Sequence, residues 1–166
     1  MDFQSFRSAN EAGFEGFIPF SQLKERKGTI PTAMGVYLVL KPDGFEPNYL
    51  QVGTGGAFKN RDPNVALSVL AENWVFSANV LYIGKAGGSA LVSTLRKRLV
   101  QYFDFGHGKP IGHSGGRLIW QLQNSGALVV CWKVTKVEPS EIESSLIAEF
   151  KVKFGVRPFA NLKDLW

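Results

Sequence analysis

Two polar side chains fall where helical periodicity predicts apolar contact, and both could act on a phosphate. Between residues 139 and 154 the apolar positions repeat with a helical period, and Glu143 lies in the middle of that apolar stripe. A carboxylate in such a place is costly unless it is paired or binds a metal ion. Two interpretations stay open: a structural ion pair with an arginine, or a ligand for magnesium or manganese, which prefer oxygen donors.

The second such side chain is Arg98. A helical pattern over residues 91–104 places Arg98 on one border of an apolar stripe that begins at Leu91, and Arg96 near the other border. Tyr102 follows Arg98 by one turn, so the two side chains can meet. We therefore expect Arg98, rather than Arg96, to reach a phosphate group. The alternative is an arginine whose aliphatic stem covers the core.

Positive charge is concentrated around this helix. The chain carries a net charge of +5, and six basic residues but only one acid lie between Lys85 and Arg117. Such a run is often only a solvated face, but beside a candidate active site it favours a phosphate-binding surface. His113 could contact phosphate through a backbone nest, unless its glycine-rich loop is an ordinary one. The residues expected to bind nucleic acid are Arg96, Lys97, Lys109, His113 and Arg117.

The order of elements predicts an α+β fold with a small, three-stranded, mainly antiparallel sheet flanked by helices. Ser21 and Asp62 are expected to cap helices, and Gly155 to end the last one. The expected strands are 35–41, 79–84 and 128–137, and the expected helices are 21–27, 62–73, 91–104, 117–123 and 139–154.

Length and composition indicate one well-packed domain. The chain has 166 residues, of which 45% are hydrophobic, and we expect residues 1–166 to form a single domain. Its one cysteine, Cys131, cannot form an internal disulfide, and it lies in an apolar strand where we expect a small core residue. No signal-peptide pattern and no apolar run near the ~20 residues of a membrane span are present. We expect a soluble, cytoplasmic protein with no membrane partner.

Two tripeptides complete the pattern. Gly35-Val36-Tyr37 and Tyr82-Ile83-Gly84 each lie in a strand-like run and precede Arg98, Glu143 and Asn161 in that order. This arrangement resembles the GIY-YIG nuclease family, whose members cut phosphodiester bonds in DNA with one divalent metal ion. Many spaced matches in order are more specific than one tripeptide. The closest local similarity is to the branch in bacterial nucleotide-excision-repair nucleases, through Tyr82-Ile83-Gly84-Lys85-Ala86, Arg98-Leu99 with Tyr102-Phe103, Ile142-Glu143 with Leu146-Ile147, and Arg157-Pro158 with Asn161.

The resemblance implies a metal-dependent DNA endonuclease that uses one Mg²⁺ or Mn²⁺ ion, with a family core at about 31–166 and an insertion at about 45–74. DNA is the expected partner, and neither a protein partner nor a homo-oligomer is indicated. In some members a histidine follows the arginine by one turn, where this chain has Tyr102. The implied roles are Tyr37 or Tyr82 as general base with help from Lys85, Arg98 as phosphate stabiliser, Glu143 as metal ligand, Asn161 as brace and Tyr102 as a contact to the phosphate or its water.

Two other functions remain open at this stage. The chain could be a non-catalytic DNA-binding module that retains the GIY-YIG fold. It could also be a structural or interaction protein whose partner surface is formed by the aromatic residues of the insertion. Those aromatics could equally cover an enlarged core; they are Phe45, Tyr49, Phe58 and Trp74.

Overall fold

A four-stranded antiparallel sheet organises the chain, in a computed structural model that describes residues 1–89, 92–113 and 115–162. The strand order is β1-β4-β2-β3. In sequence order the strands are β1 (Glu15–Pro19), β2 (Gly35–Leu40), β3 (Val80–Ala86) and β4 (Val129–Val134).

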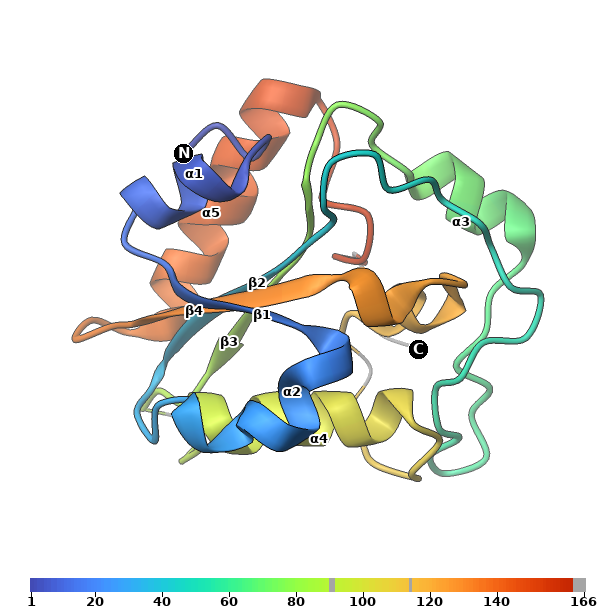
Figure 1. Cartoon of the computed structure of the whole chain (residues 1–166), viewed down its shortest axis with the longest axis horizontal. Helices are drawn as coiled ribbons and strands as arrows, with labels where there is room; N and C mark the ends of the chain where they lie inside the picture. Colours follow the sequence, from blue (N-terminus) through green and yellow to red (C-terminus); the bar gives the residue numbers. More distant parts are fainter. Residues whose placement is uncertain (90–91, 114, 163–166) are drawn as a thin grey trace.

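Helices cover both faces of this sheet (Figure 1). One face packs against α1 (Phe6–Glu11) and α5 (Pro139–Phe154), and the other against α2 (Phe20–Arg26) and α4 (Leu95–Gly106). The remaining helical segments are α3 (Leu67–Asn73) and the 3-10 turns η1 (Lys27–Thr29), η2 (Arg117–Gln121) and η3 (Ser125–Ala127). Among the described residues, no helix has the length and apolarity needed to cross a membrane.

The central strand, β2, separates two hydrophobic cores. All six of its residues are buried, and successive side chains point to opposite faces of the sheet. Tyr37 and Val39 enter the core under α2 and α4, whereas Val36 and Leu38 enter the core under α1 and α5. Cys131 of β4 is buried in the second core, as expected, and burial raises the pKa of its thiol.

The α+β class is confirmed, but the expected count of three strands is wrong because β1 adds a fourth. The local sequence does not predict β1. Gly16 and Phe17 both have positive φ, and the register of pairing between β1 and β4 shifts between Glu15 and Ile18. A bulged, short edge strand shows no two-residue alternation. The helix α2 follows β1 directly, so its N-cap is Pro19 and Ser21 lies inside the helix rather than capping it.

Other boundaries follow local capping chemistry. The helix α5 runs from Pro139 to Phe154 and ends at left-handed Gly155, as expected. Asp62 does not cap a helix. Its carboxylate accepts a hydrogen bond from the backbone N–H of Asn64 at 2.9 Å in a turn, and α3 begins only at Leu67.

The start of the arginine helix also differs from the sequence expectation. The helix α4 begins at Leu95, where the Thr94 side chain accepts from the Lys97 amide. The expected first residue, Leu91, lies outside the described residues.

Backbone hydrogen bonds and the buried side chain of Gln121 hold the segment around 45–74 to the rest of the chain. The amide of Gln121 donates to the carbonyls of Leu50 and Val65 and accepts from the Val65 backbone N–H. Trp74 is buried and contacts Tyr49 edge to face, with ring centroids 6.3 Å apart. Trp74, and Phe45 and Tyr49 that pack against it, therefore cover the core.

Arg96 supports the entry to α4. Its guanidinium donates to the Ile30 carbonyl at 2.9 Å and to the Gly28 carbonyl at 2.8 Å, which ties the helix to the η1 turn. Arg96→Ala should lower the free energy of unfolding by about 1–2 kcal/mol, because both charge-assisted hydrogen bonds disappear. Urea denaturation measures this. The neighbouring, exposed Lys97→Ala should change stability by less than about 0.5 kcal/mol, and equal effects of the two substitutions would contradict the assignment.

Candidate functional site

The candidate site is built on β3, one of the two edge strands of the sheet. Tyr37 of β2 is paired with Gly84 of β3, and Val39 with Tyr82, so both tyrosines point to the α4 face. Their ring centroids are 5.9 Å apart. A Cβ atom at Gly84 would overlap the Tyr37 ring, so glycine at this position lets the ring lie across β3.

A third tyrosine closes the cluster from the helix. The Tyr102 ring of α4 lies 6.4 Å from that of Tyr37 and 5.8 Å from that of Tyr82. Its hydroxyl donates to the Gly116 carbonyl at 2.8 Å. Gly116 has a φ of 73°, and a Cβ atom there would press on Tyr82 and on the Tyr102 hydroxyl. The backbone before η2 therefore packs directly on two of the three buried tyrosines.

Burial decides the protonation of these phenols. It raises the pKa of Tyr37, and the opposing effects of the Arg98 charge and of Tyr82 are smaller. The pKa of Tyr82 and of Tyr102 is raised further, also chiefly by burial. The Tyr37 hydroxyl makes no well-formed hydrogen bond within the described residues, although Arg98 lies close enough to influence it. All three phenols are therefore protonated at neutral pH in this state.

Lys85 and Glu143 lie on the other face of the same strand. Lys85 is paired with Val36 and points toward α5, where its Nζ is 3.2 Å from Glu143 Oε2. The Glu143 side chain is 19% exposed, and its burial raises the carboxyl pKa, while the charges of Lys85 and Arg98 oppose that rise. The ion pair expected for Glu143 is thus formed with a lysine rather than an arginine. The charge of Arg98 also opposes the rise in the pKa of Tyr37 on the opposite face of the sheet.

Asn161 braces the strand between them. Its Oδ1 accepts from the Ile83 amide at 2.9 Å and its Nδ2 donates to the Ile83 carbonyl at 2.8 Å. Ile83 lies between Tyr82 and Gly84, so these two bonds fix the part of the backbone that carries the cluster. Its role as a brace of an active site stays a prediction.

The five residues expected to bind nucleic acid are not gathered in one place. Arg96 lies in the first turn of α4 and Lys109 follows the end of this helix, which is roughly 18 Å long at 1.5 Å per residue. Lys109 pairs with Asp104 at 3.0 Å, Lys97 is exposed, and Arg117 is half-buried with its pKa lowered by burial. Their role in binding stays a prediction.

His113 occupies a place that neither sequence interpretation included. Its ring is 1% exposed and stacks on Tyr102, with centroids 4.8 Å apart and planes at 28°. Burial, with a smaller effect from Arg98, lowers its pKa to about 3. His113 is thus a neutral member of the tyrosine cluster rather than a loop residue exposed to solvent. No periodic signal could have placed it, because it lies between elements.

Few acidic side chains near the candidate site could bind a metal ion. Within the described residues, no group of three or more His, Cys, Asp and Glu side chains is placed to hold one. Glu143 alone would fit a magnesium or manganese ion whose remaining ligands are waters and a phosphate, which is how Mg²⁺ commonly binds at phosphate-processing sites. A cation there would compete with Lys85 for Oε2 or bind through Oε1.

Comparisons of the chain with protein-family models, with curated proteins and with solved structures gave no significant match. The resemblance to the GIY-YIG family therefore rests on the motif residues of the sequence.

The buried histidine predicts a pH-dependent stability. The folded-state pKa of His113, about 3, lies below the usual 6.5, so below pH 6.5 only the unfolded chain takes up this proton. Its contribution to stability is present above pH 6.5 and is lost as the pH falls toward 3, at up to about 1.4 kcal/mol per pH unit. His113→Phe should flatten the stability curve measured by urea denaturation between pH 7 and 5. Exposed His107→Gln is the control, and parallel curves for the parent and His113→Phe would refute the assignment.

Proposed function

We propose that the protein is a metal-dependent DNA endonuclease of the GIY-YIG type that hydrolyses phosphodiester bonds. The observation that supports this most is the convergence of Tyr37, Tyr82, Arg98, Lys85 and Glu143 on one edge strand, from segments far apart in the sequence. In this proposal β2, β3 and β4 are the three family strands and β1 is an addition.

Arg98 is the proposed phosphate stabiliser. It lies close enough to Tyr37 and to Glu143 to influence the pKa of both. A guanidinium offers several N–H donors in a fixed planar fork that matches phosphate oxygens. Donors already in position where negative charge develops lower the barrier without reorganising during the reaction.

The proposed general base is Tyr37 or Tyr82. Because both phenols are protonated in the buried state, either could accept a proton from water only while passing its own proton on, or after solvent and DNA lower its pKa. Burial raises the pKa of both phenols, and the positive charge of Arg98 opposes that rise. Arg98 is therefore the cation that favours the phenolate form of both. Lys85, next to Gly84 on the same strand, is the proposed helper.

Glu143 is the proposed ligand of the divalent ion. When bound, such an ion would polarise the phosphate and the leaving oxygen. Lys85 then has to share or release the carboxylate that it now holds at 3.2 Å. Asn161 would keep β3 in place, and Tyr102 would contact the phosphate or its water.

One observation favours the alternative, a non-catalytic DNA-binding module. The three tyrosines are at most 6% exposed, so DNA cannot reach their hydroxyl groups in this conformation. The two functions are separated by incubating the protein with nicked, branched, single-stranded and duplex DNA in magnesium, manganese or chelator. Cleavage that requires the metal supports the endonuclease, and binding without cleavage supports the module.

Arg98→Ala should reduce the single-turnover cleavage rate at saturating DNA by roughly a hundredfold or more, the scale for losing one donor to a developing oxyanion. Arg98→Lys should recover little, because a point charge does not replace the planar fork. Rapid-quench measurement of the cleaved strand gives these rates. Arg7→Ala removes an exposed arginine from α1 and is the matched control. An Arg98→Ala protein that cuts at the parent rate would remove Arg98 from the site.

Glu143→Ala should abolish cleavage while DNA binding is kept or slightly strengthened, because a negative charge near the phosphate disappears. Glu141→Ala, at an exposed position on the same helix, should cut normally. Electron paramagnetic resonance of Mn²⁺, recorded with uncleavable DNA, should show loss of bound ion in the Glu143 variant alone. Equal Mn²⁺ binding in both variants would leave Glu143 as a structural acid.

A further inference from the structure

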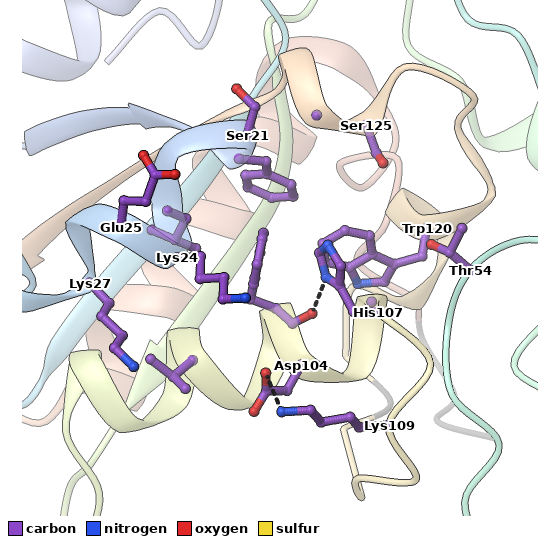
Figure 2. Close-up of a pocket in the computed structure, with 16 residues that line it drawn as sticks. Ser21, Lys24, Glu25, Lys27, Thr54, Asp104, His107, Lys109, Trp120 and Ser125 are labelled. Atoms are coloured by element: carbon purple, nitrogen blue, oxygen red, sulfur yellow. Dashed lines mark hydrogen bonds and ion pairs between the residues drawn. The ribbon is translucent and has the colours of Figure 1, made fainter.

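A pocket lies on a different flank of α4 from the candidate site. It has a volume of about 780 Å³ and lies between α2, the second half of α4 and the turn at residues 125–126 (Figure 2). Phe103 and His107 line it, roughly half a turn around the helix from Arg98 at 100° per residue. None of the proposed catalytic residues lines it. Its volume is that of a small-molecule site.

One wall of the pocket is aromatic. Phe20, Phe103, His107 and Trp120 contact one another, with centroids 4.2 Å apart for Phe103 and His107 and 5.3 Å apart for Phe20 and Trp120. The His107 ring is held by a 2.8 Å contact between its Nδ1 and the Phe103 carbonyl. The buried indole N–H of Trp120 has no acceptor among the described residues. That N–H is itself shielded from solvent, so this wall offers a ligand its ring surfaces, which suit a planar ligand.

The rim of the pocket carries more positive than negative charge. Its cations are Lys24, Lys27 and Lys109, and its carboxylates are Glu25 and Asp104. Asp104 is already paired with Lys109, whereas Lys24 and Lys27 form no ion pair within the described residues. In Figure 2 Lys24 extends toward α4, and the Glu25 carboxylate points away from Trp120 and His107. Lys24 and Lys27 are therefore available to an anion on the ligand.

We propose that this pocket binds a nucleoside phosphate, with the base against the aromatic wall and the phosphate between Lys24 and Lys27. Stacking of a base on aromatic side chains and neutralisation of its phosphate by lysine are the two contacts that proteins use for single nucleotides of a strand. The ligand is either a free nucleotide or one nucleotide of a DNA strand. The proposal does not require that the protein cuts DNA.

The first experiment measures the ligand class. The four 2′-deoxynucleoside 5′-monophosphates, the matching nucleosides and inorganic phosphate are each titrated into the protein by calorimetry. At least one monophosphate should bind saturably, and its nucleoside and inorganic phosphate should each bind about tenfold or more weakly, because each lacks one of the two contacts. Inorganic phosphate that binds as tightly as every monophosphate would overturn the role of the aromatic wall.

Two variants then place the ligand in the pocket. Gly126 lines it, and a Cβ atom there would meet only the Ser21 Cβ, at 3.9 Å, so Gly126→Phe should fill the space without disturbing the backbone. It should weaken monophosphate binding by about tenfold or more. Lys24→Ala combined with Lys27→Ala should do the same for the monophosphate and leave the nucleoside unchanged. Lys151→Ala, exposed on α5, is the charge control, and circular dichroism verifies that each variant is folded.

A fluorescent single-stranded oligonucleotide distinguishes the two sources of the ligand. If Gly126→Phe weakens oligonucleotide and monophosphate binding by similar factors, the pocket holds a nucleotide of a strand. If only the monophosphate is affected, the pocket holds a free nucleotide, and both results support the proposal. Absence of saturable binding by every monophosphate would overturn it, as would binding that is unchanged in Gly126→Phe and in the double lysine variant.

Discussion

An edge strand leaves its outward-facing N–H and C=O groups without partners, and the way this chain satisfies them on β3 determines the candidate site. Asn161 binds both backbone groups of Ile83, and the Ala160 amide donates to the Leu81 carbonyl at 2.8 Å. These bonds come from the segment after α5, which returns along the free edge. They hold in place the stretch of β3 that presents Tyr82 to one helix layer and Lys85 to the other.

Much of the fold could be predicted where a boundary is encoded locally. The helix α5 has proline in its first turn and a left-handed glycine after its last residue, so both ends were predicted correctly. The strand β1 was missed because a bulge and two positive-φ residues interrupt its pattern, and its existence depends on pairing with β4, which is far away in the sequence. The start of α3 was wrong because Asp62 uses its carboxylate in a turn that looks the same as a helix cap in the sequence.

The site could be predicted as a set of side chains but not as a set of contacts. Helical phase separates Arg98 from Arg96, and in the structure Arg98 lies near Tyr37 while Arg96 binds the carbonyls of the η1 turn. The helical phase predicts which face of a helix a side chain lies on, but not which residues of other elements pack against that face. The ion pair of Glu143 with Lys85 could therefore not be predicted. The burial of His113 was also not foreseen, since a loop has no period from which to infer it.

Cys131 has a practical consequence for spectroscopy of this protein. It is the only cysteine, it is fully buried in the core, and its pKa is raised, so almost no reactive thiolate reaches solvent in the folded state. A cysteine introduced at an exposed position can therefore be labelled with a maleimide dye or a nitroxide without first removing the native one. Distances across the two faces of the sheet become measurable in solution on a protein that differs from the parent only at the labelled positions.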